Sequence, residues 1–472
     1  MLMSSAQHTS DGDASATLCQ AIAQWRYESL PGAVISTLKT FLLDEVGVIA
    51  GAARAPGIAQ LNARLGRWET TGSATGLIGK RRFSPPSAAL ANGTAGHALD
   101  YDDQHDPARV HTNCVVFPAL LASAEDAAPI SGKDFLLAHA VGAEIHARLG
   151  LACYNSLGKG WHPTMTFGTL AAALAVGRLL KLDATRLRNA LGIAYHQASG
   201  SAQSMREGAL TKRLGAGFAA RAAVLGAFLA ADGVGSTHHT LEGSAGLFSL
   251  YERGEVDAGR LFAGLGHDWR IPEYSLKPYP CCRCNHTAIE IGIRLHDDGV
   301  RAGDVTAIEI GMGHVNWLTV GAPYDAGRDD VVHAQFNVAY GFARALHDGK
   351  VDLASYTRPA ITAPQVAALA AKTRVVDDPA IPRTAIEPVR VRVTLAGGRI
   401  IEKRLDVIKG SAQNPLTAAE RMAKFYDCLE FGFGAPQSAA DRLAEVLLNI
   451  DRESNAAAAI VAAFPRAQAV LA

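Results

Sequence analysis

The densest group of side chains that could transfer protons lies between positions 97 and 111. Carboxylates, imidazoles and a guanidinium follow one another there: His97, Asp100, Asp102, Asp103, His105, Asp106, Arg109 and His111. The simplest interpretation is a polar loop that caps a helix ending near Leu99. Asp and His also bind zinc or iron, but no pair of His or Cys residues stands at a metal-binding spacing. The pattern therefore predicts no metal ion.

Two further segments place titratable or charged side chains near glycines. In residues 158–164 (GKGWHPT), the glycines before His162 allow close backbone approach, which suits a pocket wall, although a loop histidine can equally be an ordinary surface residue. In residues 211–221 (TKRLGAGFAAR), Lys212 and Arg213 stand at the start of an Ala-rich helix. The helix amides and dipole would add to their charge and favour a bound carboxylate, unless both side chains are simply solvated.

Two patterns look like cofactor motifs and are rejected. Gly215-x-Gly217-x-x-Ala220 imitates a dinucleotide fingerprint, but a true fingerprint follows a hydrophobic strand, and residues 204–210 are not one. A second stretch invites a zinc proposal through Cys281, Cys282, Cys284 and His286. Their spacing is too tight for an ordinary four-ligand site, and small buried thiols explain it as well. Lys277, between apolar residues just before them, is of more interest.

The composition excludes several classes of protein. Hydrophobic residues make up 49% of the 472 residues and charged residues 19%, which indicates a large core rather than disorder. Lys+Arg and Asp+Glu number 45 each, and we expect no nucleic-acid binding without a basic excess. The apolar stretches 168–180 and 218–231 are interrupted by Arg178 and Arg221, so we expect no membrane span. Seven cysteines and a polar start at residues 1–16 favour a cytoplasmic protein.

Hydrophobic periodicity predicts a mostly α-helical chain with an α+β insert. Helical spacing covers 17–60, with a helix starting at Pro31, and recurs in 85–100, 113–128, 133–151, 164–182, 184–199, 213–233 and from Thr417 to 463. Between them, 304–312 alternates like a strand, 389–405 reads as a hairpin with Gly397 and Gly398 as a two-residue turn, and 331–348 and 364–371 look helical. The predicted domains are a large all-helical domain (1–267 and 411–472) and a smaller α+β lid domain (268–410).

Six segments together resemble the MmgE/PrpD family over nearly the whole chain. They are LLDEVGVIAGA (42–52), NGTAGHALDYDD (92–103), KGWHPTMTFGTLAAALA (159–175), TKRLGAGFAARAAVLGAFLA (211–230), YSLKPYPCCRCNHTAIE (274–290) and NPLTAAERMAKF (414–425). The family includes 2-methylcitrate dehydratase, cis-aconitate decarboxylase and iminodisuccinate epimerase. The resemblance implies a homodimer with no metal or organic cofactor and an active site in the cleft between the domains.

Carried over by motif, the resemblance places Asp100, His111, His162, Lys212 and Lys277 in that cleft. The loop before His111 is about one residue longer than in decarboxylase members, so His105 stays an alternative to His111. We expect His111 or His162 to act as base and acid, Asp100 to orient an imidazole, and Lys212 to hold a carboxylate or transfer a proton. Substrate binding is expected from Lys277, Arg213 and His286.

These residues predict an enzyme that moves a proton α to a carboxylate on a small polycarboxylate, which requires a positioned base and cations to stabilise the developing charge. A dehydratase acting on a 2-methylcitrate-like hydroxy acid is preferred, because this is the most widespread activity in the family. An epimerase of a dicarboxylate such as iminodisuccinate is the alternative. A cis-aconitate-type decarboxylase, or a carboxylate-binding protein without catalysis, is less favoured. The Arg that follows Lys212 differs from the decarboxylase members.

Overall fold

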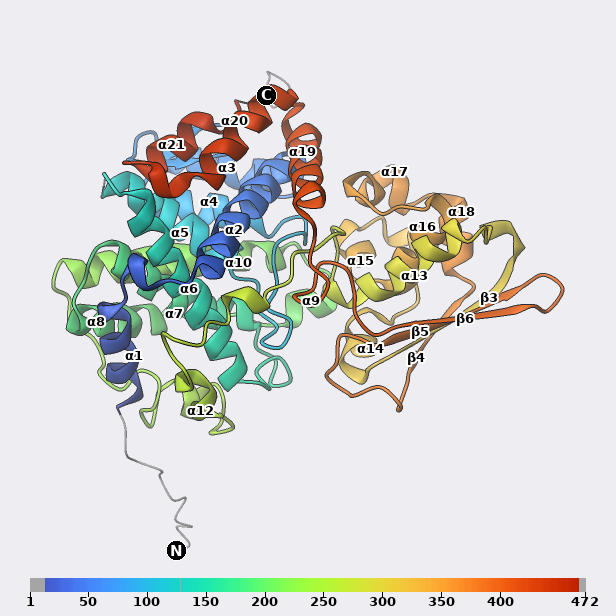
Figure 1. Ribbon diagram of the computed structural model, residues 1–472, viewed down its shortest axis with the longest axis horizontal. Coiled ribbons are helices and arrows are strands. Elements are labelled where there is room, and N and C mark those ends of the chain that lie inside the picture. Colours follow the sequence, from blue (N-terminus) through green and yellow to red (C-terminus); the bar gives the residue numbers. More distant parts are fainter. Residues whose placement is uncertain (1–12, 128, 467–472) are drawn as a thin grey trace, which may run out of the picture.

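The computed structural model describes residues 13–127 and 129–466, and it is mostly helical with a small mixed sheet in the C-terminal half (Figure 1). Two hydrophobic cores account for most of the buried residues. The first draws on residues 18–276 and again on 416–464, and the second on residues 281–395. Both ends of the described chain therefore pack into one helical part, and the α+β part is built from the segment between them.

The helical part follows the predicted helices closely. Its N-terminal helices are α1 (Ala14–Gln24), α2 (Gly32–Gly51), α3 (Ile58–Trp68), α4 (Pro85–Gly96), α5 (Asn113–Asp126), α6 (Gly132–Ala152), α7 (Pro163–Leu179), α8 (Ala184–Tyr195), α9 (Gln203–Glu207), α10 (Thr211–Ala231), α11 (Leu247–Leu250) and α12 (Ala258–Phe262). The chain returns as α19 (Ala418–Phe433), α20 (Gln437–Leu448) and α21 (Ala456–Ala463). A short antiparallel hairpin, β1 (Ala74–Gly76) and β2 (Arg81–Phe83), was not predicted.

The glycines of the fingerprint-like motif serve helix packing. Helix α10 crosses α4 and α7. A Cβ atom on Gly217 would come within 2.4 Å of the Leu90 carbonyl on α4, and one on Gly215 within 2.3 Å of Met165 Sδ on α7. The Leu90 carbonyl is backbone and cannot give way, so position 217 needs glycine, and this close approach sets the start of α10, with Lys212, against α4.

Helix α10 is also the one described helix that is long and apolar enough to cross a membrane. Its apolar window is 61% buried inside the protein. It packs against α4, α7 and α8, as a core helix of a soluble protein does, which agrees with the expectation that this stretch is no membrane span.

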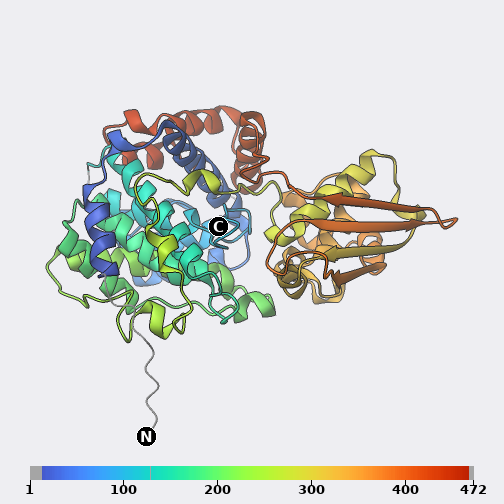
Figure 2. The same ribbon diagram turned by 60° about the horizontal axis from the view of Figure 1, so that its bottom comes forward.

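The α+β part holds a four-stranded sheet in the order β4-β3-β5-β6. The strands are β3 (Val305–Met312), β4 (Thr373–Asp377), β5 (Val389–Leu395) and β6 (Ile400–Leu405), with β3 parallel to β4 and the other pairs antiparallel. The helices are α13 (His286–Asp297), α14 (His314–Val320), α15 (Val331–Gln335), α16 (Val338–Asp348), α17 (Arg358–Ile361) and α18 (Pro364–Ala370). Helices α13 and α16 pack on each other and on the sheet, which lies along one side of this part (Figures 1 and 2).

The predicted strand at 304–312 and the hairpin at 389–405 are confirmed, and two details differ. Three residues, 396–398, close the hairpin, because the Leu395 amide donates to the Arg399 carbonyl at 2.8 Å. The helix predicted over 331–348 is broken into α15 and α16, where the Asn337 side chain accepts from the Tyr340 amide and caps α16. The edge strand β4 was not predicted.

The two chain crossings between the parts lie side by side. The Leu276 amide donates to the Gly410 carbonyl at 2.9 Å. Gly410 has a φ of +84°, and a Cβ there would come within 2.0 Å of the Leu276 carbonyl oxygen, so this position needs glycine. A small third cluster joins Leu353 of the α+β part to Tyr101 and Cys428 of the helical part. The proposed domain boundaries stay a prediction, and residues 1–12 and 467–472 of the helical domain lie outside the described residues.

Candidate active site

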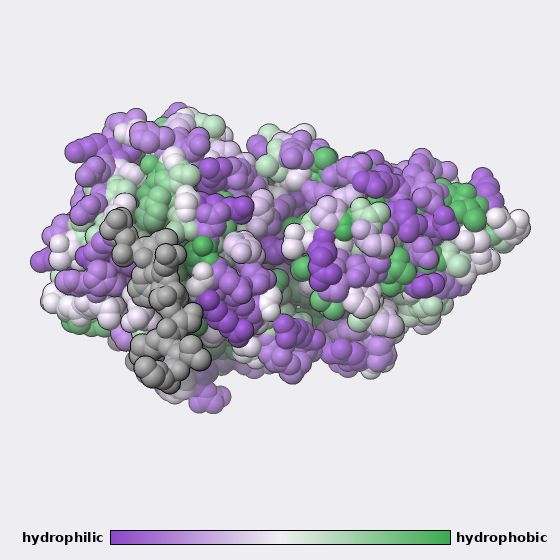
Figure 3. Space-filling model, turned by 90° about the horizontal axis from the view of Figure 1, so that it is seen from below, coloured by the Kyte–Doolittle hydropathy of each residue, from purple (hydrophilic) through white to green (hydrophobic). Residues whose placement is uncertain are grey.

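A cavity of about 50 Å³ lies where the two parts meet. The helical part supplies its polar and apolar lining residues Asp100, Gln104, Arg109, His111, Leu157, His162, Pro163, Met205 and Lys212. The α+β part supplies Cys282, Arg283, Cys284, Thr319 and Phe336. The surface narrows between the two parts, and hydrophilic side chains border this waist (Figure 3). Four residues proposed from the sequence, Asp100, His111, His162 and Lys212, thus line one cavity.

Asp100 joins the two predicted lysines at the floor of this cavity. Helix α4 ends at Gly96, and the chain turns through Asp100 with a φ of +52°, a conformation that Asp tolerates better than most residues. One carboxylate oxygen accepts from Lys212 Nζ at 3.1 Å and from Lys277 Nζ at 2.9 Å. Burial would raise the pKa of Asp100, but the two ammonium groups lower it far below its usual range. Asp100 therefore stays ionised and holds the lysines rather than an imidazole.

His97 connects Lys212 to a second carboxylate below the cavity. Its Nδ1 lies 2.8 Å from Asp102 Oδ2 and its Nε2 lies 2.9 Å from Lys212 Nζ. His97 is 1% exposed and Asp102 is fully buried. Burial lowers the pKa of His97, and the Lys212 charge lowers it further although Asp102 acts in the opposite direction. A neutral imidazole thus lies between a carboxylate and an ammonium group.

Two other imidazoles line the cavity above this chain of contacts. His111 Nδ1 donates to the Asp103 carbonyl at 2.7 Å, which leaves Nε2 available. His162 precedes α7, and its Nδ1 has no hydrogen-bond partner among the described residues. Burial lowers the pKa of both histidines well below the usual value. The charges of Lys277 and Lys212 lower the pKa of His111 further, whereas the Asp102 charge raises it. Both imidazoles are therefore neutral near neutral pH and can accept a proton.

Three other candidates from the sequence point elsewhere. His105 is directed away from the cavity, with Nδ1 accepting from the Ala108 amide and Nε2 3.3 Å from Glu273. Arg213 donates to the Pro56 carbonyl at 3.0 Å. His286 contacts the Cys281 carbonyl through Nε2 at 3.2 Å. None of them is among the cavity residues, so the geometry favours His111 over His105 and gives Arg213 and His286 no direct access to a ligand.

Arg109 and Arg283 bring positive charge to the cavity, and the sequence had not marked them as binding residues. Arg283 is paired with Asp106 at 3.1 Å. Arg109 has a φ of +54° and donates to the Thr384 carbonyl at 2.5 Å. Among the residues that the structure describes, Arg109 forms no ion pair, so its charge is available to a ligand. Its presence in the polar cluster of residues 97–111 was the available signal.

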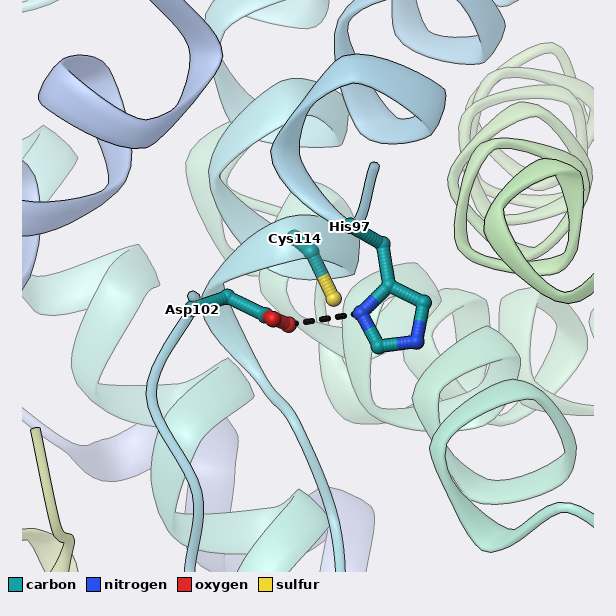
Figure 4. A group of neighbouring side chains, drawn as sticks. All are labelled: His97, Asp102 and Cys114. Carbon is teal, nitrogen blue, oxygen red and sulfur yellow. Dashed lines mark hydrogen bonds and ion pairs between the residues drawn. The ribbon is translucent and has the colours of Figure 1, made fainter. Parts of the chain in front are cut away.

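His97, Asp102 and Cys114 lie close enough to invite a metal ion (Figure 4). Their chemistry does not suit one. Both nitrogens of His97 are engaged, by Asp102 and by Lys212. Burial, with Asp102 nearby, raises the pKa of the Cys114 thiol well above its usual value, whereas a metal ligand must be a thiolate. The Lys277 ammonium, 3.8 Å from Asp102, further disfavours a cation.

Comparison with known proteins identifies the family of this chain. The profile of the MmgE/PrpD N-terminal domain matches residues 16–258, and that of the MmgE/PrpD C-terminal domain matches residues 279–450. The chain therefore belongs to the MmgE/PrpD family, as the sequence motifs indicated.

Curated relatives are about equally distant from this chain. The cis-aconitate decarboxylase-like protein oryM of Aspergillus oryzae is 30% identical over 390 residues, which is 77% of this chain and 80% of the relative. Cis-aconitate decarboxylase of Aspergillus terreus is 30% identical over 380 residues, 76% of each chain. The human cis-aconitate decarboxylase is 30% identical over 359 residues, 73% of this chain and 72% of its own length. The protein is thus an enzyme of a family that acts on carboxylic acids.

Proposed function

We propose that this protein is a lyase that acts on a small tricarboxylate and moves a proton at a carbon α to a carboxylate, with its own side chains supplying the acid and the base. The observation that carries the proposal is the position of Lys212. Its ammonium group contacts Asp100 and His97 and also lines the cavity, where the neutral imidazoles of His111 and His162 lie. An acid and two bases thus border the same space.

The proposed reactions pass through negative charge next to a carboxylate, because loss of an α-proton or of CO2 leaves an enediolate-like anion. Lys212 and Arg109 are the cations available to that charge and to the retained carboxylates. Lys277 is fully buried beneath Asp100 and contributes through it. Lys212 then acts as the proton donor and His162 or His111 as the acceptor.

Decarboxylation of an acid such as cis-aconitate is the leading reaction. The relatives at 30% identity carry that name. The lining of the cavity also includes the apolar residues Leu157, Pro163, Met205 and Phe336. A carboxylate placed there loses hydration that neutral CO2 does not need, which favours its departure. Lys212 then delivers a proton to the α-carbon of the resulting anion.

Dehydration of a 2-methylcitrate-like hydroxy acid is the second candidate. Two neutral imidazoles suit removal of an α-proton, which decarboxylation does not need. The apolar lining residues would then contact the methyl group, and Lys212 would protonate the leaving hydroxyl.

Proton NMR in D2O distinguishes these reactions. The purified protein, treated with EDTA, is incubated with 2-methylcitrate, citrate, isocitrate, cis-aconitate, malate and both forms of iminodisuccinate. Loss of CO2 from cis-aconitate, with one deuteron at the α-carbon of the product, supports the leading proposal. New olefinic signals from a hydroxy acid support dehydration. Deuterium uptake with inversion indicates an epimerase, and no change with any compound, alongside a thermal shift, indicates a binding protein.

A homodimer and a cytoplasmic location stay predictions. The described surface of α10 carries exposed Phe218 and Leu225, seven positions apart on one face of the helix, with 42% and 38% exposure. A second copy packed on this face would bury them. Light scattering should give twice the chain mass for the native protein and the monomer mass for Leu225→Lys.

All seven cysteines are free and buried, which supports a reducing compartment.

A further inference from the structure

We infer that Asp102 and His97 act as a buried relay that positions Lys212 and sets how readily it exchanges its proton with the cavity. This inference rests on the proposed function of Lys212 as an acid, and it assigns roles to two residues that do not touch the substrate. Both are positioning residues. The contacts that carry the inference are His97 Nδ1 to Asp102 Oδ2 at 2.8 Å and His97 Nε2 to Lys212 Nζ at 2.9 Å.

The direction of each hydrogen bond follows from the charges. Burial would raise the pKa of Asp102, but the hydrogen bond from His97 and the nearby Lys277 ammonium hold it well below its usual value, so Asp102 is an acceptor only. His97 must therefore donate from Nδ1. Because burial keeps this imidazole neutral, Nε2 carries a lone pair and accepts from Lys212. Asp102 thus selects the one tautomer of His97 that can accept a hydrogen bond from the lysine.

The Lys212 ammonium group has one N–H donor left for a ligand in the cavity. An ammonium group has three N–H donors. One is directed to His97 Nε2 and a second to Asp100 Oδ1, at 2.9 Å and 3.1 Å. The third is free for the cavity that Lys212 lines. After Lys212 gives up that proton, the amine keeps two donors for His97 and Asp100 and presents a lone pair to the cavity. Lys212 can therefore give and recover a proton without moving.

The position of the relay argues against a purely structural role. His97 directly follows α4, and the left-handed turn at Asp100 brings Asp102 back to it, so that the relay and the Asp100 contact arise from one loop. A histidine needed only for packing does not require a charged partner at each nitrogen. The titratable and charged groups that surround the lysine come from the loop after α4, from the start of α7 and from the crossing before α13: His97, Asp100, Asp102, His111, His162 and Lys277.

The test compares Asp102→Asn, His97→Gln and His97→Leu in the full-length protein. Asparagine can still accept from His97 and removes only the charge. Glutamine can accept from Lys212, whereas leucine cannot, so glutamine should restore part of what leucine loses. His105→Gln is the matched control, because His105 is equally buried, contacts Glu273 and does not line the cavity.

The first readout does not depend on turnover. Acetylation of Lys212 by isotope-coded acetic anhydride, followed by mass spectrometry across pH 6 to 10, measures the fraction present as the reactive amine. In Asp102→Asn the ammonium form of Lys212 loses the stabilising charge of Asp102. Acetylation of Lys212 at neutral pH should therefore rise about tenfold. His97→Leu should show a similar change, His97→Gln a smaller one and His105→Gln none. Unchanged labelling in Asp102→Asn would overturn the relay, even if His97→Leu fails to fold.

The second readout is the pH–rate profile with the substrate found by NMR. Because the reaction needs Lys212 protonated, its alkaline limb should move about one unit to lower pH in Asp102→Asn and stay in place in His105→Gln. An equal fall in rate at every pH would indicate a structural role and contradict the relay. If the native protein turns over no compound, the proposed function fails, and the labelling experiment still decides whether the relay exists.

Discussion

The helical part and the α+β part contribute different chemistry to the same cavity. The helical part supplies all the groups that we propose to transfer protons: His111, His162 and Lys212, with Asp100 below them. The α+β part supplies a wall, including Thr319 and Phe336, and no histidine that lines the cavity. From this difference we infer that the helical part carries out the proton transfer and that the α+β part determines which substrate fits. Substitutions on the two sides should therefore have different kinetic effects.

The largest effect is expected on the helical side from Lys212→Ala. Loss of the acid should lower kcat about 10³-fold, within the range for one general acid, while the protein stays folded. Steady-state kinetics and circular dichroism would measure both. Lys181→Ala is the control, because the Lys181 side chain is 66% exposed and its one ion pair among the described residues is with Asp134. If Lys212→Ala reacts at a rate near that of the native protein, Lys212 is not the acid.

The next largest effect should separate the two histidines of one loop. His111→Asn should lower kcat roughly 100-fold, because it removes a neutral base from the cavity. His105→Asn should leave kcat nearly unchanged, because His105 faces Glu273. Both variants are compared below their unfolding temperatures. If His105→Asn lowers kcat more than His111→Asn does, the assignment of His111 as the base in the cavity is wrong.

A smaller effect, on KM rather than kcat, is expected from the α+β wall. The Phe336 ring lies 5.0 Å from Lys212 Nζ. Phe336→Leu keeps an apolar wall and removes a cation–π contact worth about 0.5–1 kcal/mol, so KM should change roughly twofold to fivefold. Steady-state kinetics with the substrate found by NMR would measure KM and kcat separately. A fall in kcat as large as that of Lys212→Ala would contradict the claim that the α+β part acts on substrate binding and not on proton transfer.

The smallest effect on activity, none, is expected at a buried histidine away from the cavity, which affects stability instead. Burial alone lowers the pKa of His139 to about 3, so the unfolded chain binds a proton that the folded protein does not. Stability should thus be complete above about pH 6.5 and fall as the pH drops toward 3, by up to about 1.4 kcal/mol per unit from this residue. Urea unfolding of His139→Leu at pH 7 and pH 5 should show a weaker dependence, with activity unchanged. An equal dependence in both proteins would show that His139 is protonated in the fold.

The helices were predictable because Ala and Leu recur with helical spacing, and the hairpin because alternation and paired glycines are local signals. Strand β4 was missed because its five residues depend on parallel pairing with β3, which lies far away in sequence. Likewise, the short hairpin β1–β2 gives too few residues for a periodic signal.

The site was predictable by residue type but not by direction. Lys212 and Arg213 are adjacent on a helix, where side chains differ by about 100°, so only one can face the cavity. His97 looked like part of a helix cap, because its link to Asp102 depends on the left-handed turn at Asp100. Arg109, which lines the cavity, belongs to the polar cluster of residues 97–111, but its residue type alone did not mark it as a binding residue.

The most direct test is a crystal structure of Lys212→Ala with the tricarboxylate that the native protein converts. We expect the ligand in the cavity between the two parts, with its reacting carbon within about 3.5 Å of His162 or His111 and of the space vacated by the lysine amine, and with a carboxylate on Arg109. A ligand bound elsewhere, such as the hollow lined by Ser36, Thr40 and Arg421, or one bound with its carboxylates turned away from these groups, would contradict it.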